Sequence, residues 1–151
     1  MIITKSKEKC LLESKDYFLI KHPDRVKLLG EVFTPTELVL EILDQLPDQV
    51  WEDGKTYLDP TCGNGQFLAA VLIIKMELRH TNPLSTIYGV DIMRDNVQEC
   101  KKRLLDIAGW TKENIRTVNH RIRRKNGLDY DYKFEKEYPM QTEIFDWDSI
   151  K

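Results

Sequence analysis

Residues 59–68, with the sequence DPTCGNGQFL, constrain the fold of this chain more than any other stretch. Residues 56–58 before it predict a short strand, and the almost continuously apolar residues 67–79 predict a buried helix. In an open α/β sheet, such a strand, glycine turn and helix place a ligand site at the carboxyl end of the strand. Gly63 and Gly65 allow positive φ and a close approach of the backbone to a ligand. The free N–H groups at the start of the helix favour an anionic group. A glycine turn can also be a plain tight connection, so a second signal is needed.

The second signal is an acidic residue at the end of the next predicted strand. Residues 86–90 (TIYGV) predict that strand, and Asp91 follows directly. A carboxylate at this place commonly holds ribose hydroxyls. Asp91 also fits a helix cap, but the strand pattern and the preceding glycine favour the ribose role. The third glycine position of the dinucleotide fingerprint is occupied by Phe67 or Leu68, which disfavours a pyrophosphate-bearing nicotinamide. A nucleoside with a short charged tail fits better.

Composition limits the class of protein. The 151 residues suit one domain, and a formal net charge of −2 gives no overall attraction to nucleic acid. No apolar run is long enough for a membrane span, and no signal-peptide pattern begins the chain.

The scattered histidines predict no metal site. The odd number of cysteines, without metal-ligand spacing, predicts a reducing cytoplasmic location: Cys10, Cys62 and Cys100. Cys62 has no base near it in sequence, which favours a small packed residue over a nucleophile.

Two amphipathic helices flank this core. Thr34 as cap, Pro35 as first helical residue and Glu37 as capping-box partner predict a helix start. That helix ends at residues 47–48, and its apolar stripe is Val39, Ile42, Leu43 and Leu46. The second helix follows Asp91 and stops at Gly109. Its apolar stripe is Val97, Cys100, Leu104 and Ile107.

Three ordered motifs resemble a known family. They are GEVFTP at residues 30–35, DPTCGNG at residues 59–65 and YGVDI at residues 88–92. They are similar to those of S-adenosylmethionine-dependent adenine-N6 DNA methyltransferases of restriction–modification systems and phages. The resemblance covers roughly residues 30–132 and implies a partial Rossmann-like class I methyltransferase fold, the N-terminal half of an α/β sheet with flanking helices. A Rossmann-like domain for another nucleotide is the alternative.

The resemblance also assigns roles within the site. The loop at Thr34 closes over the methionine end of the cofactor, where Thr34 contacts the carboxylate, and Ile92 lies flat against the adenine. Residues 126–130 (NGLDY) resemble the third motif, whose first residue bonds the adenine amino group. The family usually has Asp there, and the carbonyl of Asn126 also accepts a hydrogen bond. The predicted S-adenosylmethionine-binding residues are Phe33, Thr34, Pro35, Asp59, Thr61, Gly63, Gly65, Phe67, Asp91, Ile92 and Asn126.

One expected motif is absent from the sequence. In the family, a fourth strand ends in Asn/Asp-Pro-Pro-Tyr/Phe, which holds the target adenine, and no such motif occurs in these residues. We therefore predict no catalytic residue here and an unpaired edge on the first strand, covered by the tail, a second copy or a complementary chain. That chain would supply the catalytic motif and target recognition, and with them the contact with DNA. The alternative is a non-catalytic regulatory or sequestering module that binds S-adenosylmethionine.

The chain is predicted to have three parts. Residues 1–29 form a helical extension with no evident chemistry, residues 30–132 the S-adenosylmethionine-binding α/β domain, and residues 133–151 an acidic tail. The basic run within residues 116–125 fits either DNA phosphate contacts or a charged edge strand that resists pairing.

Overall fold

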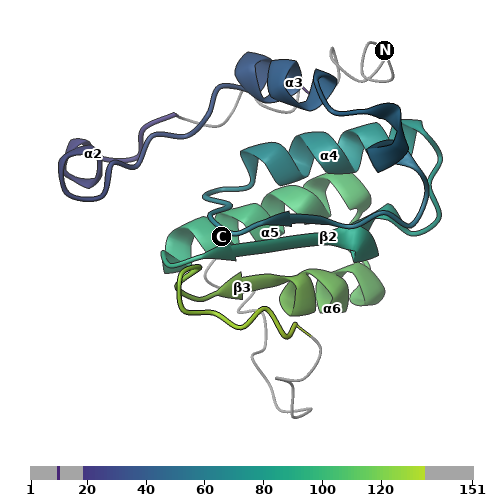
Figure 1. Cartoon of the computed structure of the whole chain (residues 1–151). Coiled ribbons are helices and arrows are strands. Elements are labelled where there is room, and N and C mark those ends of the chain that lie inside the picture. Colours follow the sequence, from purple (N-terminus) through teal and green to yellow (C-terminus); the bar gives the residue numbers. More distant parts are fainter. Residues whose placement is uncertain (1–9, 11–18, 135–151) are drawn as a thin grey trace.

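The computed structural model describes Cys10 and residues 19–134 (Figure 1). The elements in chain order are α2 (Pro23–Leu29), α3 (Thr36–Asp44), the 3-10 helix η1 (Asp48–Trp51), β1 (Tyr57–Asp59), α4 (Gln66–Glu77), the 3-10 helix η2 (Pro83–Thr86), β2 (Ile87–Asp91), α5 (Arg94–Ala108), α6 (Lys112–Arg121) and β3 (Ile122–Arg124). The predicted tail lies, apart from its first two residues, outside the described part of the chain.

The described strands form one parallel sheet in the order β1-β2-β3. Asp59 pairs with Gly89, and Asp91 pairs with Arg124, so the three carboxyl ends meet at one edge. The strands predicted at residues 56–58 and 86–90 are confirmed to within one residue. This small α/β arrangement agrees with a partial methyltransferase fold.

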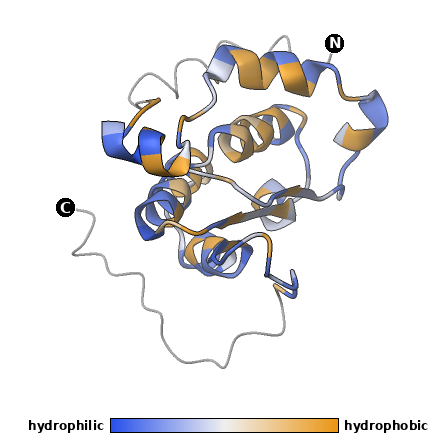
Figure 2. Cartoon of the chain, turned by 60° about the vertical axis from the view of Figure 1, so that its left-hand side comes forward, coloured by the Kyte–Doolittle hydropathy of each residue, from blue (hydrophilic) through white to orange (hydrophobic). Residues whose placement is uncertain are grey.

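Helix α4 is buried along nearly its whole length, from Leu68 to Lys75. It lies against α3, α5 and the sheet, so little of its surface is left for solvent. Figure 2 shows the hydrophobic residues gathered on the inner sides of the helices. The prediction of a buried helix after the glycine turn is confirmed. Its one buried cation, Lys75, donates hydrogen bonds to the carbonyl of Lys55 and the hydroxyl of Thr86.

Helix α3 starts later than predicted. Its N-cap is Pro35, which has no side-chain acceptor, so neither the Thr34 cap nor the capping box forms. The buried residues are Thr36, Val39, Leu40 and Leu43. Ile42 was predicted on the apolar stripe but is 41% exposed. The buried face, which packs against α4, is therefore turned from the predicted stripe towards Thr36 and Leu40.

Helix α5 ends at Gly109 as predicted. Gly109 has φ +101° and donates its N–H to the carbonyl of Leu105. Helix α6 was not predicted; Thr111 caps it by accepting the N–H of Asn114. The basic run is therefore divided between α6 and β3. Strand β3 lies at the edge of the described sheet, as the edge-strand interpretation expects. Protection of this edge by its charge and contact with DNA both stay predictions.

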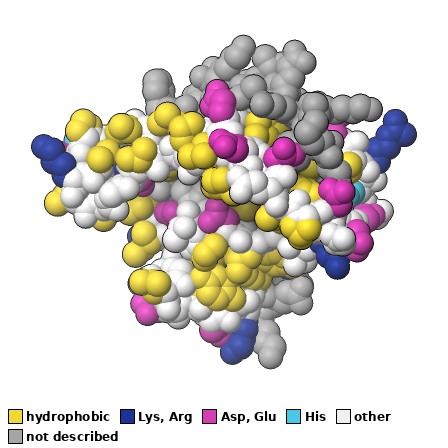
Figure 3. All heavy atoms as spheres, turned by 45° about the horizontal axis from the view of Figure 1, so that its top comes forward, with side chains coloured by type: hydrophobic (Ala, Val, Ile, Leu, Met, Phe, Trp, Pro, Cys, Tyr) yellow, Lys and Arg dark blue, Asp and Glu magenta, His cyan; other side chains and the backbone are white. Residues whose placement is uncertain are grey.

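The N-terminal extension contains helix α2, which projects from the body of the molecule (Figure 1). In the space-filling view, hydrophobic side chains are exposed on this projecting end (Figure 3); Leu28 is 82% exposed and Leu29 57%. No helix of the described part is long and apolar enough to span a membrane.

Candidate functional site

A pocket of about 430 Å³ opens at the carboxyl ends of β1 and β2. Its walls are the glycine turn before α4, the start of α5 and the loop between α2 and α3. The residues that line it are Leu29, Gly30, Glu31, Val32, Phe33, Thr34, Asp59, Thr61, Cys62, Gly63, Gln66, Phe67, Asp91, Ile92, Met93 and Asn96. Its size and position match those of small-molecule sites in α/β sheets.

Asp91 is the centre of the hydrogen bonds in this pocket. Its Oδ2 accepts the N–H of Gly63 at 3.0 Å, and its Oδ1 accepts the N–H of Met93 at 2.8 Å. Asn96 Nδ2 donates to the same Oδ1 at 3.3 Å. Helix α5 begins only at Arg94, with Met93 as N-cap, so Asp91 is not the cap of this helix. Its carboxylate instead ties the glycine turn to the end of β2, facing the pocket.

The two glycines of the turn have different surroundings. Gly63 has φ +53°, and a Cβ there would lie 3.1 Å from the ring of Phe33, inside the pocket. Gly65 has φ +88°, and a Cβ there would lie 2.8 Å from Sγ of Cys100 on α5. The first glycine keeps the site open, whereas the second lets α4 start close to α5. The backbone N–H groups of both glycines already have partners. The N–H of Gly63 donates to Asp91, and the N–H of Gly65 donates to the carbonyl of Cys62 at 2.9 Å.

Asp59 supplies a second carboxylate at the end of β1. It accepts the N–H of Thr61 at 3.1 Å, which fixes the start of the turn. Burial raises the pKa of Asp59, and the negative charge of Asp91 adds to this shift. Both predicted residues, Asp59 and Thr61, line the pocket.

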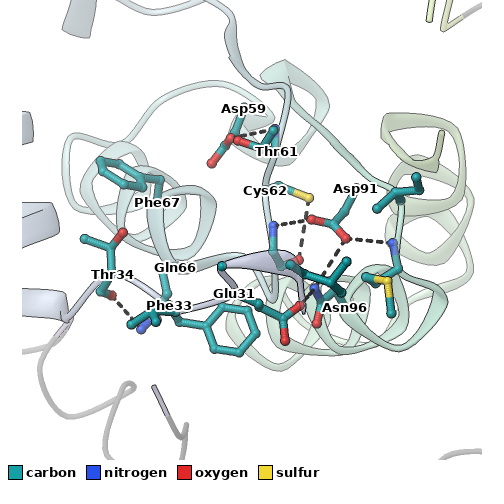
Figure 4. Close-up of a pocket in the computed structure, with 16 residues that line it drawn as sticks. Glu31, Phe33, Thr34, Asp59, Thr61, Cys62, Gln66, Phe67, Asp91 and Asn96 are labelled. Carbon is teal, nitrogen blue, oxygen red and sulfur yellow. Dashed lines mark hydrogen bonds between the residues drawn. The ribbon is translucent and has the colours of Figure 1, made fainter. Parts of the chain in front are cut away.

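The opposite side of the pocket is formed by the loop before α3. Figure 4 shows Thr34 and Phe67 on the side away from Asp91 and Asn96. Gln66 holds this loop, because its Nε2 donates to the carbonyl oxygen of Thr34 at 2.9 Å. Phe33, Thr34 and Phe67 all line the pocket, and their contact with a cofactor stays a prediction.

Three predicted residues do not line the pocket. Pro35 is the N-cap of α3, and Gly65 packs against α5. Asn126 lies just past β3, but its side chain belongs to a local turn: Oδ1 accepts the N–H of Leu128 at 3.1 Å, and Nδ2 donates to Asp129 at 2.9 Å. A contact between Asn126 and adenine stays a prediction, for which Oδ1 has a second lone pair.

Sequence reasoning missed a polar cluster beside Asp91. Asn96 Nδ2 donates to Glu31 Oε2 at 2.8 Å as well as to Asp91. Glu31 stands within the GEVFTP motif but received no role. Asn96 is 2% exposed although it is polar, and it stands one helical turn before Cys100 on the apolar stripe of α5. A polar residue on an otherwise apolar stripe needs buried partners, so Asn96 was the signal in the sequence that could have revealed this cluster.

The N-terminal extension, predicted to carry no chemistry, anchors this cluster. Arg25 donates from Nη2 to Glu31 Oε2 at 2.6 Å and from Nη1 to Asp95. Lys21 donates to Asn96 Oδ1 at 2.8 Å and forms ion pairs with Asp95 and Glu99. Although burial acts in the opposite direction, the bonds from Arg25 and Lys21 lower the pKa of Asp95 to about 2.

Cys62 does not have the surroundings of a nucleophile. The pKa of Cys62 is raised well above its usual value. The larger cause is a hydrogen bond with the thiol of Cys100, and burial adds to it. Its N–H donates to the carbonyl of Val90 at 2.8 Å, so it links the turn to β2. In the described part of the chain, no group of His, Cys, Asp or Glu has the arrangement of a metal site.

Residues 10–141 match the family model described as N-6 DNA methylase. This match spans most of the 151-residue chain. The chain belongs to the N-6 DNA methylase family. No curated protein and no solved structure matches it. The pocket described above thus lies within a chain of a family of DNA methyltransferases.

Proposed function

We propose that this chain binds S-adenosylmethionine and forms the cofactor-binding part of a DNA adenine-N6 methyltransferase. The family supports methyltransferase chemistry on DNA, and the pocket lies where α/β folds bind nucleosides. The restriction–modification or phage setting and the cytoplasmic location stay predictions.

The charge of the pocket is the observation that carries the choice of ligand. Among the described residues that line it, three are acidic, namely Glu31, Asp59 and Asp91, and none is Lys or Arg. Such a wall repels phosphate groups and favours hydroxyl donors and cations. S-adenosylmethionine carries a sulfonium, an ammonium and a ribose against one carboxylate, so it fits this wall better than a nucleoside phosphate does. This argues against a Rossmann-like domain for another nucleotide.

The residues have separable roles in this proposal. Asp91 accepts a hydrogen bond from the ribose, Ile92 packs on the adenine, and Thr34 with Phe33 encloses the methionine end. S-adenosylmethionine supplies the methyl group for transfer when it is bound. Asp59 stands at the end of β1, where its carboxylate attracts the positive charge of the ligand.

A complementary polypeptide segment completes the enzyme in this proposal. The free edge of a strand presents unpaired N–H and C=O groups, which can pair with a further strand. In the described part of the chain β1 pairs only with β2, and Leu58 on it is 49% exposed. A strand added parallel to β1 would end beside Asp59 and the pocket. Residues that orient the target adenine, and that meet DNA, would come from that segment, from a separate chain or from a second copy.

The test of cofactor binding is calorimetric titration with S-adenosylmethionine and S-adenosylhomocysteine. Asp91→Ala should weaken binding by about 1–3 kcal/mol, because buried hydroxyls lose their acceptor. Asp44→Ala, at an exposed site on α3, is the matched control and should bind as the wild type does. Absence of binding by the wild type, or full affinity of Asp91→Ala, would refute the assignment.

A second candidate is a binding module without transfer activity. The observation in its favour is that these 151 residues contain no Asn/Asp-Pro-Pro-Tyr/Phe motif. Such a protein would sequester the cofactor or regulate another methyltransferase. Both candidates share the pocket and differ in whether a complementary segment restores methyl transfer.

A further inference from the structure

Asp91 has too few free acceptor positions to hold a ribose diol by itself. A carboxylate offers about four lone-pair positions. The N–H groups of Gly63 and Met93 and the amide of Asn96 already occupy three of them. One position is left, whereas the two neighbouring hydroxyls of a ribose present two donors. A second acceptor is needed in the pocket.

Glu31 provides an oxygen that meets this need. It lines the pocket, and its side chain is 12% exposed. Its Oε2 accepts bonds from Asn96 and Arg25, but its Oε1 is buried and has no hydrogen-bond partner in the described part of the chain. An unsatisfied buried carboxylate oxygen is costly. Once the Glu31 side chain turns this oxygen towards the pocket, a donor that arrives with a ligand would be bound strongly.

The amide of Asn96 places the two carboxylates side by side. Its Nδ2 reaches Glu31 Oε2 at 2.8 Å and Asp91 Oδ1 at 3.3 Å. In Figure 4 the three side chains lie together on one side of the pocket. Repulsion between the acids is offset by Arg25, which bonds Glu31 at 2.6 Å, and by Lys21, which bonds Asn96 at 2.8 Å.

We propose that Glu31 and Asp91 share the ribose, with Glu31 Oε1 accepting one hydroxyl and Asp91 the other. The proposal rests on the proposed function and makes Glu31 a specificity-determining residue for a ribose over a deoxyribose ligand. Arg25 and Asn96 are positioning residues, which act by holding Glu31. The N-terminal extension then contributes to recognition of the ligand and not only to the fold.

The test uses S-adenosylhomocysteine and its 2′-deoxy and 3′-deoxy analogues, titrated by calorimetry into wild type and Glu31→Gln. In this variant the amide oxygen keeps the bonds to Asn96 and Arg25, and the NH₂ group replaces the free oxygen with a donor. We expect each missing hydroxyl to cost the wild type about tenfold in affinity. Glu31→Gln should bind S-adenosylhomocysteine about tenfold more weakly than the wild type does. It should also bind one of the two deoxy analogues as well as it binds S-adenosylhomocysteine.

Glu37→Gln on α3, at an exposed position, is the matched control and should keep both preferences. If circular dichroism shows that Glu31→Gln is unfolded, the same titrations are made with Glu31→Asp, in which the carboxylate is drawn back from the ligand. Equal weakening towards all three compounds, or a wild type indifferent to both hydroxyls, overturns the inference while the proposed function stands. A wild type that binds none of them overturns both.

Discussion

The Cα of Gly65 faces Cys100 so closely that a Cβ on this glycine would lie 2.8 Å from the cysteine Sγ and 3.4 Å from its Cα. This contact explains the second glycine of the DPTCGNG motif. Helix α4 begins directly after Gly65 and runs against α5, so a side chain at this position would push the two helices apart. The motif thus combines one glycine that lines the pocket, Gly63, with one at a helix contact, Gly65.

Gly65→Ala should therefore lower the free energy of unfolding by about 2–4 kcal/mol, from the positive φ and the overpacking against Cys100. Denaturant titration measures this loss. The cost should shrink in a Cys100→Ala background, which removes the sulfur but not the strained φ. An equal cost in both backgrounds would show that the clash is not responsible.

Gln66 connects the buried Arg103 to the loop before α3. It accepts a bond from Arg103 Nη1 and donates to the Thr34 carbonyl at 2.9 Å. Gln66→Leu should cost about 2–4 kcal/mol of stability, because both partners lose a buried bond. It should also speed amide hydrogen exchange at Phe33 in the same loop, whose N–H donates to the carbonyl of Leu19 at 2.8 Å. Gln49→Leu, at an exposed site on η1, is the control, and equal effects of the two variants would contradict this role.

The sequence predicted the parts of the fold that depend on local patterns. The strand–turn–helix around Gly63, the strand ending in Asp91 and the stop at Gly109 were recognisable because glycine, apolar runs and alternation act within a few residues. The predicted start of α3 was wrong. As N-cap, Thr34 would use its carbonyl for the first bond of the helix, but this carbonyl accepts the side-chain amide of Gln66 instead. That bond joins distant segments and leaves no local signal.

The same limit applies to the site. Eight of the predicted residues line the pocket: Phe33, Thr34, Asp59, Thr61, Gly63, Phe67, Asp91 and Ile92. All eight belong to the sequence motifs or stand directly beside them. Glu31 and Asn96 were missed because their importance comes from a bond between a loop and a helix 65 positions apart. Lys21 and Arg25 belonged to an extension whose charges look like an ordinary solvated surface until α5 is placed beside them.

The ion pair between Arg25 and Asp95 should be visible in a titration. The pKa of Asp95 is about 2 in the folded chain, below the ordinary value of about 3.9. Because the folded pKa is the lower one, this contact stabilises the docking of α2 above about pH 4, and the contribution is lost as pH falls towards 2. Carbon-13 NMR of the Asp95 carboxyl should show this pKa in the wild type.

Arg25→Ala should move the titration of Asp95 back towards about pH 4. Lys27→Ala, an exposed cation on the same helix, should leave it unchanged. A wild-type Asp95 that titrates near pH 4 would mean that α2 does not hold α5 through this pair in solution.

Methyl transfer separates the two proposed functions. In adenine-N6 transfer, an amide or carboxylate must orient the target amine towards the methyl group, and much of the rate comes from this positioning. The late asparagines of the sequence are Asn114, Asn119 and Asn126, and we predict that none of them serves this purpose. Asn114 donates to the carbonyls of Ala108 and Gly109, and Asn126 is held in its own turn. None of these three asparagines is followed by proline.

We therefore expect the purified 151-residue chain to transfer no tritium from labelled S-adenosylmethionine to unmethylated DNA, even in samples where calorimetry shows bound cofactor. The matched experiment adds a polypeptide that carries a strand and an Asn-Pro-Pro-Tyr motif. Transfer only with this addition identifies the chain as the cofactor half of a methyltransferase, because pairing at β1 would bring the motif to the pocket. No transfer in either sample favours the binding module. Robust transfer by the chain alone would contradict the prediction and require a catalytic residue among the side chains that already line the pocket.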